Sequence, residues 1–168
     1  LRKNKLISRQ LVMVGKKGWR YPDIAKAIRN SGFERDILLA GYVPDEDLVY
    51  IYNAADLFVY PSLYEGFGFP PLEAMACGTP VITSNITALP EVVGDAAILV
   101  DPKDIDGLAE VMHEVLSQNS LRLKLIEKGL KRVKHFSWEN VAKKTLSVYN
   151  RVCRKTTMKG NKHRFIRK

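Results

Sequence analysis

Two glutamates separated by seven residues, Glu65 and Glu73, are the side chains of this sequence best placed to act on a ligand. Between them lies a loop with two glycines, Gly66 and Gly68, where the backbone can turn sharply and approach a ligand closely. Carboxylates repel a phosphate, but they accept hydrogen bonds well from neighbouring hydroxyl groups. A ligand with a sugar ring on each side of a diphosphate would therefore suit both glutamates, and a nucleotide sugar has that form.

The segment after the glycines is expected to begin a helix whose start faces this ligand. Two consecutive prolines lack backbone N–H groups and suit a first helical turn, and the helix over residues 72–77 would end at a glycine. The positive end of the helix dipole, with its unpaired N–H groups, favours a phosphate. A simpler alternative stays open, in which Glu73 stands in the first turn and only complements the dipole, while Glu65 is a solvated loop residue.

A longer run surrounds the two glutamates, and it reads Ser62-Leu-Tyr-Glu-Gly-Phe-Gly-Phe-Pro-Pro-Leu-Glu-Ala-Met-Ala-Cys-Gly-Thr-Pro-Val-Ile82. This run resembles the signature of retaining glycosyltransferases of the GT-B fold, in the large group 1 class that includes glycogen synthase, sucrose synthase and bacterial mannosyltransferases. The resemblance extends from about Gln10 to Tyr149, with further matching segments that begin at Gly41, Asn53, Leu89 and Phe136.

The resemblance implies roles for individual residues in binding a nucleotide-sugar donor. Glu65 would be the catalytic residue, which holds and orients the donor sugar, and Glu73 would anchor the ribose. The other donor-binding positions that it implies are Gly66, Phe67, Gly68, Phe69, Val43, Asp45, Gly15 and Lys17. Asp45 is also a good N-cap for a helix over residues 46–55, and the two roles are compatible. Lys16 and Lys17, which follow Gly15, could meet the phosphate, but they are better explained as solvated surface residues.

The alternation of apolar strands and amphipathic helices predicts an α/β fold, a doubly wound, Rossmann-like parallel sheet with helices on both faces. Ligands in such sheets bind beyond the carboxyl ends of the strands, and the glycine loop follows one such end. The predicted strands are residues 10–15 (expected to be buried), 36–40, 56–60, 80–83 and 96–100, and the main helices are 21–31, 46–55, 105–117, 120–134 and 138–152.

The resemblance identifies the chain as the C-terminal, donor-binding half of a GT-B glycosyltransferase without the first βα unit of that half. The absent unit would carry an Arg and a Lys that grip the diphosphate, and an absent N-terminal domain would bind a glycan or lipid-linked acceptor. We expect residues 1–153 to form an N-terminally truncated nucleotide-sugar-binding domain and residues 154–168 to form a basic, disordered tail. The chain alone should therefore bind its donor weakly and lack catalytic activity.

The net charge of +9 comes from the end of the chain. All 18 acidic residues lie at or before Glu139, whereas the last 29 residues hold ten of the 27 Lys and Arg. The folded part is thus almost neutral and gives no sign of a specific nucleic-acid partner, while the tail could meet an anionic membrane surface. Cys77 and Cys153 are typical of reduced thiols in a cytoplasmic protein, peripheral at the inner membrane face if the tail binds there.

No metal or other cofactor is expected. The segments Asp45-Glu-Asp47 and Asp104-Ile-Asp106 have the form of a metal-binding pair, but both stand at predicted helix starts, where acids act as caps. The three histidines lie far apart, without the spacing of a metal site or a catalytic triad.

The predicted function is that of a glycosyltransferase (hexosyltransferase) in glycan or polysaccharide biosynthesis. It would transfer a sugar, with retained anomeric configuration, from a GDP- or UDP-linked donor to a glycan or lipid hydroxyl. Two alternatives remain open from the sequence: a non-catalytic nucleotide-sugar-binding fragment, and a membrane-surface adaptor that acts through the basic tail.

Overall fold

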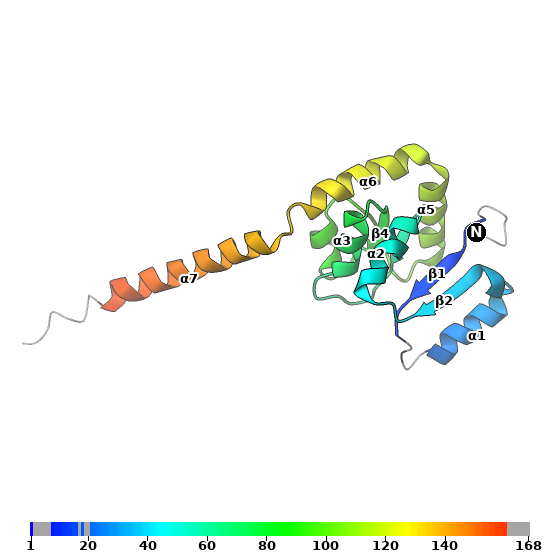
Figure 1. The fold of residues 1–168 in the computed structure, drawn as a ribbon, viewed down its shortest axis with the longest axis horizontal. Coiled ribbons are helices and arrows are strands. Elements are labelled where there is room, and N and C mark those ends of the chain that lie inside the picture. Colours follow the sequence, from blue (N-terminus) through cyan, green and yellow to red (C-terminus); the bar gives the residue numbers. More distant parts are fainter. Residues whose placement is uncertain (2–7, 17, 19–20, 161–168) are drawn as a thin grey trace, which may run out of the picture.

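The computed structural model describes residues 1, 8–16, 18 and 21–160, with residues 154–160 by their backbone alone. It confirms an α/β chain whose strands pair in parallel (Figure 1). The strands are β1 (Leu11–Val14), β2 (Ile37–Gly41), β3 (Phe58–Tyr60), β4 (Val81–Ser84) and β5 (Ile98–Val100). The helices are α1 (Tyr21–Ser31), the 3-10 helix η1 (Glu34–Asp36), α2 (Asp45–Ala54), α3 (Phe69–Ala76), α4 (Leu89–Val93), α5 (Ile105–Ser117), α6 (Asn119–Val133) and α7 (Trp138–Gly160).

In the described residues the strands form two parallel sheets, β1-β2 and β3-β4-β5, where one continuous sheet was expected. In the common doubly wound order 3-2-1-4-5-6, strands 3-2 and 4-5-6 form a pair and a triple of this kind on the two sides of strand 1. The prediction of a buried first strand is wrong for β1, because in the described residues it pairs only with β2 and neither of its faces is fully covered. Leu11, Val12 and Val14 are between 42% and 47% exposed.

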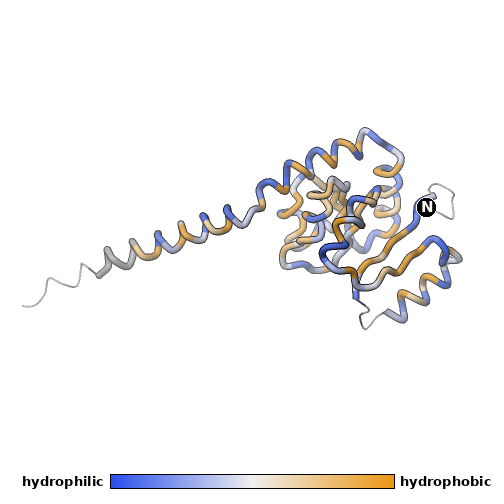
Figure 2. The backbone as a smooth tube through the Cα atoms, in the orientation of Figure 1, coloured by the Kyte–Doolittle hydropathy of each residue, from blue (hydrophilic) through white to orange (hydrophobic). Residues whose placement is uncertain are grey.

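The core of the larger sheet lies on both sides of β4. Successive side chains of a strand point to opposite faces, and Val81 and Ile82 are both completely buried. Val81 packs in a cluster with residues of α2, α3 and α4, whereas Ile82 packs in a second cluster with residues of α5 and α6. Helices therefore cover both faces of β3-β4-β5, as the doubly wound arrangement requires, and Figure 2 shows the apolar residues gathered inside this body.

The helix that follows the glycine loop is fixed by close packing against α6. Gly129 of α6 faces Met75 of α3, and a Cβ atom at Gly129 would lie 3.1 Å from Met75 Cγ. Met75 is only 1% exposed. The absence of a side chain at Gly129 thus allows the two helices to approach closely, which fixes the last turn of α3 against α6.

The last helix extends away from this body (Figure 1). Ser137 caps it, since its Oγ accepts a hydrogen bond from the Asn140 N–H at 3.2 Å. α7 continues to Gly160, so the backbone is helical where the sequence predicted the disordered tail to begin, and residues 161–168 lie outside the described residues. None of the described helices is both long enough and apolar enough to span a membrane.

Candidate functional site

The loop between β3 and α3 is shaped by a glycine that no other residue could replace without strain. Gly68 is the N-cap of α3, with φ 111° and ψ 57°, in the left-handed region that residues with a Cβ rarely adopt. A Cβ atom at this position would also lie 2.7 Å from Leu89 Cδ2. The predicted sharp bend is therefore present, and the helix ends as predicted, with Gly78 at φ 74°.

The start of α3 differs from the prediction in one respect. The helix begins at Phe69, ahead of the two prolines, so Glu73 is its fifth residue and does not stand in the first turn as predicted. Because the prolines have no N–H, the amides available to an anion are those of residues 66–69. In the described part of the chain these four amides donate to no other group.

Glu65 is held by three neighbours at the end of β3. Tyr60 Oη donates to Glu65 Oε1 at 2.5 Å, and Ser62 Oγ donates to the same oxygen at 3.0 Å. The backbone N–H of Glu65 donates to Thr87 Oγ1 at 3.3 Å. Burial, together with the hydrogen bond to Glu65 and the charge of that residue, raises the pKa of Tyr60 to about 12, so the phenol stays protonated at neutral pH.

Glu73 has a tyrosine partner of its own. Tyr52 Oη donates to Glu73 Oε2 at 3.1 Å, and the Tyr52 carbonyl accepts from Thr79 Oγ1 at 2.6 Å. Burial, followed by the charge of Glu73, raises the pKa of the Tyr52 phenol far above its ordinary value. Burial and the charge of Glu73 likewise raise the pKa of Cys77. Both predicted glutamates are thus ordered acceptors on either side of the glycine loop.

An aromatic cluster borders the loop. The rings of Phe67 and Phe69 lie 4.8 Å apart, and Phe136 contacts Phe67 edge-on at 5.8 Å between centroids. The Arg132 guanidinium stands over the Phe136 ring at 5.1 Å and donates to the Val92 carbonyl. The predicted ligand positions Phe67 and Phe69 therefore connect the loop with the segment that leads into α7.

The other predicted donor residues lie on the loops that follow β1 and β2. The Gly15 N–H donates to the Gly41 carbonyl at 2.8 Å, which joins the residue after β1 to the last residue of β2. Val43 is half-buried, and Asp45 is exposed. The N-cap prediction for Asp45 is wrong, because Pro44 holds that position and Asp45 is the first residue of α2. Lys17 lies outside the described residues.

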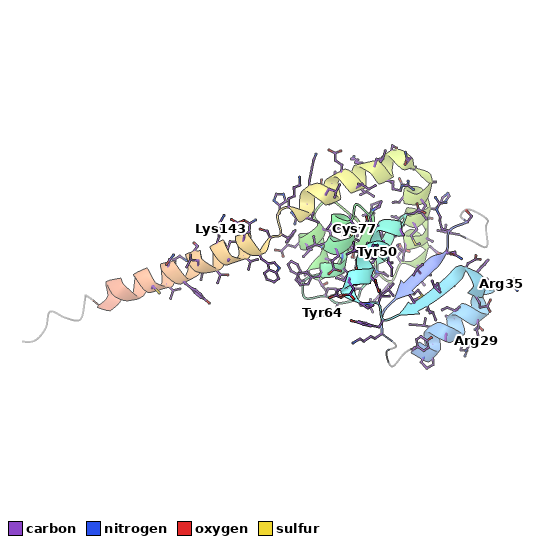
Figure 3. The ribbon with its side chains drawn as sticks, viewed as in Figure 1. Arg29, Arg35, Tyr50, Tyr64, Cys77 and Lys143 are labelled. Atoms are coloured by element: carbon purple, nitrogen blue, oxygen red, sulfur yellow. The ribbon has the colours of Figure 1, made fainter. Side chains whose placement is uncertain are left out.

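The structure places these loops and the glycine loop at the same edge of the molecule. β1 and β2 end at the lower edge of the body in Figure 1, and Tyr64 of the glycine loop lies along that edge in Figure 3. In the described residues no hydrogen bond joins Gly15, Val43 or Asp45 to either glutamate. The shared edge agrees with the rule that ligands bind beyond the carboxyl ends of parallel strands.

Sequence reasoning missed the hydroxyl residues that support this loop, which are Tyr60, Ser62, Thr83, Ser84 and Thr87. Thr83 and Ser84 are completely buried at the end of β4, and their hydroxyls donate to the carbonyls of Tyr60 and Ser62. Polar residues at the carboxyl end of a buried strand were the available signal, because such residues need partners and the ligand edge lies there. The loop at 84–87 thus holds the backbone of Glu65 through Thr87.

The described residues contain no group of three or more His, Cys, Asp or Glu side chains that could hold a metal ion. Asp104 acts as the predicted cap, since its Oδ1 accepts from the Gly107 N–H at 2.9 Å. The cap gives the carboxylate of Asp104 a structural role at the start of α5.

Comparison with known proteins identifies the family. The family description Glycosyl transferases group 1 matches residues 1–132. O-antigen chain mannosyltransferase B of Escherichia coli is 47% identical over 139 residues, which cover 83% of this chain and 36% of that protein. The solved sucrose-phosphate synthase of Thermosynechococcus elongatus is similar with a TM-score of 0.78 and 31% identity, over 87% of this chain and 39% of that one.

A second solved structure, Anabaena Alr3699/HepE in complex with UDP, has the same fold, with a TM-score of 0.77 and 19% identity over 84% of this chain and 41% of that one. The chain spans well under half the length of each of these three proteins. The match to the family covers most of the chain, and the strand pattern and the glycine loop agree with it. The chain therefore belongs to the group 1 glycosyl transferases, with the GT-B type of fold.

Proposed function

We propose that this chain supplies the donor-binding part of a retaining hexosyltransferase that uses a nucleotide-diphosphate sugar. The observation that carries the proposal is the placement of two ordered carboxylates on either side of four unpaired loop amides. A diphosphate suits the amides and the positive end of α3, and a sugar on each side suits Glu65 and Glu73. UDP in the similar Anabaena structure supports a nucleotide as part of the ligand.

The amides and the carboxylates would have different roles in the reaction. When the bond between the anomeric carbon and the diphosphate breaks, the sugar becomes oxocarbenium-like and the leaving diphosphate gains negative charge. The amides of residues 66–69 and the dipole of α3 would stabilise that charge. Glu65 would hold the donor sugar and Glu73 the ribose, so that the anomeric carbon stays open to the acceptor hydroxyl.

Retention fits an attack from the same face that the diphosphate leaves. The acceptor oxygen then bonds to the anomeric carbon, and its proton passes to the departing diphosphate, which is the nearest base on that face. A mannosyl donor with a GDP or UDP group is the substrate we favour, because O-antigen chain mannosyltransferase B is among the similar proteins. The acceptor would be a glycan or lipid-linked hydroxyl bound by another part of the enzyme.

The proposal predicts which ligands this chain binds. In saturation-transfer NMR with GDP-mannose, UDP-glucose, free GDP, free UDP and free mannose, we expect transfer from the protein to both the ribose and the hexose of at least one nucleotide sugar. Free mannose should give no signal, because the diphosphate amides contribute nothing to its binding. The affinity should be weak, so calorimetry that finds a micromolar or tighter Kd would contradict the weakness predicted for the isolated chain. No transfer to any nucleotide sugar at millimolar concentration would overturn the proposed function.

A second candidate, attachment to the cytoplasmic face of an anionic membrane, is favoured by α7. Its large apolar residues fall on one face of the helix and are exposed, and they include Trp138 at 82% and Tyr149 at 65%. Lys143, Lys144 and Arg151 fall on the opposite face. A helix with bulky apolar residues on one face and basic residues on the other is typical of segments that lie in a membrane interface.

This second candidate predicts binding to vesicles that contain phosphatidylglycerol and not to phosphatidylcholine vesicles in co-sedimentation. Tyr149→Glu should weaken binding more than Ser147→Glu, because the two substitutions add the same charge but only Tyr149 lies on the apolar face. If the two variants lost vesicle binding equally, charge alone would explain the binding and the apolar face would not contribute. Binding that disappears on deletion of residues 156–168 would assign it to the tail and not to α7.

A further inference from the structure

The carboxylate of Glu65 is held asymmetrically. Both hydroxyls that reach it, those of Tyr60 and Ser62, donate to Oε1, at 2.5 Å and 3.0 Å. Among the described residues no group donates to Oε2. The Ser62 proton is shared, because the same hydroxyl lies 3.2 Å from the Tyr64 carbonyl, so Tyr60 is the main donor. One oxygen of this carboxylate is therefore fixed and the other is left for a ligand.

The backbone of both donors is joined to the buried central strand β4 by hydrogen bonds. Tyr60 ends β3, its carbonyl accepts from Thr83 Oγ1 at 2.9 Å, and its ring stacks on Phe58 at 5.9 Å between centroids. The Ser62 carbonyl accepts from Ser84 Oγ at 2.6 Å. Thr83 and Ser84 are both completely buried in the central strand. The position of the two hydroxyls is thus determined by the sheet and not by the loop.

The backbone of Glu65 is held from the other side. Its N–H donates to Thr87 Oγ1 at 3.3 Å, and Thr87 itself has φ 60°, a left-handed conformation that is uncommon for a threonine. A local conformation of this kind persists only where the surrounding structure imposes it, and such positions cluster at binding sites. Both ends of the Glu65 side chain are therefore fixed before a ligand arrives.

We infer that Tyr60 and Ser62 are positioning residues that lock the Glu65 side chain, so that Oε2 is presented to the hydroxyls of the donor sugar. This inference rests on the proposed function. A free glutamate side chain has several rotamers, and binding through it would have to restrict them. Fixing the side chain in advance removes that cost and places the acceptor oxygen where the sugar needs it.

The protonation of Tyr60 agrees with this role. Burial and the neighbouring Glu65 carboxylate raise the pKa of Tyr60 to about 12, so that below this pH the phenol donates to the carboxylate and does not repel it. Tyr64 is in the same loop and is 81% exposed. It offers a matched control for the loss of a phenolic hydroxyl.

The test compares the Kd of a nucleotide sugar with that of its nucleoside diphosphate, for example GDP-mannose with GDP, measured by NMR titration. Tyr60→Phe should weaken binding of the nucleotide sugar about three- to tenfold, less than removal of Glu65 itself, because the lost hydrogen bond only positions the carboxylate. Binding of the nucleoside diphosphate should be unchanged. Ser62→Ala should weaken binding of the nucleotide sugar by a smaller factor. Ser62→Thr keeps the hydroxyl and should leave the Kd at the wild-type value. Tyr64→Phe should change neither ligand.

The outcomes separate the inference from the function on which it rests. If the wild-type chain binds neither nucleotide sugar nor nucleoside diphosphate, the proposed function fails. If the wild type binds them but Tyr60→Phe weakens both equally, the tyrosine has only a structural role and the inference is wrong. Unchanged binding of the nucleotide sugar by the Tyr60→Phe, Ser62→Ala double variant would also overturn it.

A ligand-independent measurement covers the case in which a variant folds poorly. In a chain with tyrosine labelled at Cζ with ¹³C, the Tyr60 resonance should still have its protonated shift at pH 10.5. The resonance that is missing from the spectrum of the Tyr60→Phe variant is the Tyr60 resonance. Glu65→Gln should move the ionisation of Tyr60 to lower pH, because it removes the negative charge beside the phenol. No difference between wild type and Glu65→Gln would show that the contact is absent in solution.

Discussion

Glu65→Ala is expected to weaken binding of a nucleotide sugar by about 10- to 100-fold, which is the range for losing hydrogen bonds to a charged acceptor. Binding of the corresponding nucleoside diphosphate should stay the same, because the proposed partner of Glu65 is the hexose. Glu65→Gln removes the negative charge and keeps the shape of the side chain, so it tests the contribution of the charge alone. Its amide oxygen can still accept from Tyr60, so this variant should fold like the wild type and show a smaller loss. Titration of each variant with GDP-mannose, UDP-glucose, GDP and UDP measures the effect.

Glu73→Ala provides the opposite pattern. Because Glu73 is assigned to the ribose, this variant should weaken the binding of the nucleoside diphosphate and of the nucleotide sugar by the same factor. Glu110, an exposed residue of α5, supplies the control, and Glu110→Ala should change neither affinity. If Glu65→Ala also weakened the nucleoside diphosphate, or if both glutamates could be removed without effect, the two carboxylates would have lost their assigned roles. The simpler alternative of a dipole partner and a solvated loop residue would then remain.

The strand, the glycine loop and the helix that follow one another from Phe58 to Ala76 could be predicted because their signals are local. An apolar strand, two glycines, two prolines and a closing glycine each restrict the backbone at their own position. Several helices could be predicted for the same reason. Residues 21–31 and 105–117 were predicted with the observed bounds, since an apolar periodicity and a capping residue such as Asp104 mark them.

The parts that could not be predicted depend on which segments meet in space. Whether β1 is buried depends on having strands on both sides, and a strand sequence alone does not report its neighbours. The support of the glutamates was missed for the same reason. Thr83 is 23 residues from Tyr60 and Tyr52 is 21 residues from Glu73, and only the register of β3 on β4 and the packing of α2 on α3 join them.

The two glutamates have the same kind of hydrogen-bond partner, which their spacing in the sequence does not reveal. Each has one carboxylate oxygen occupied by a phenolic hydroxyl from a preceding element, β3 for Glu65 and α2 for Glu73. In each pair the pKa of the tyrosine is raised, first by burial and second by the neighbouring carboxylate. A protonated phenol keeps the glutamate ordered without neutralising it, and a charged acceptor that is already ordered binds sugar hydroxyls at a lower entropic cost. Each of the two tyrosines thus orders one of the two glutamates.

Gly68→Ala is expected to lower the free energy of unfolding by about 2–6 kcal/mol. A residue with a Cβ at φ 111° is strained by about 1–3 kcal/mol. The added carbon would also lie 2.7 Å from Leu89 Cδ2. Leu89 is completely buried, so its side chain can move only by disturbing the core, and overpacking of this kind costs about 1–3 kcal/mol. Urea denaturation followed by circular dichroism measures the change.

Gly66→Ala is the matched control, because the same substitution two residues earlier adds a Cβ with nothing within 4 Å and no positive φ. Its effect on stability should stay within about 0.5 kcal/mol, as for an ordinary surface change. The folded fraction of Gly68→Ala should also bind nucleotide sugars less well, since relief of the clash would displace the amides of residues 66–69 from the start of α3. If Gly68→Ala were as stable as Gly66→Ala and bound donors normally, the loop could adopt another conformation, and the anion site would not depend on the bend described here.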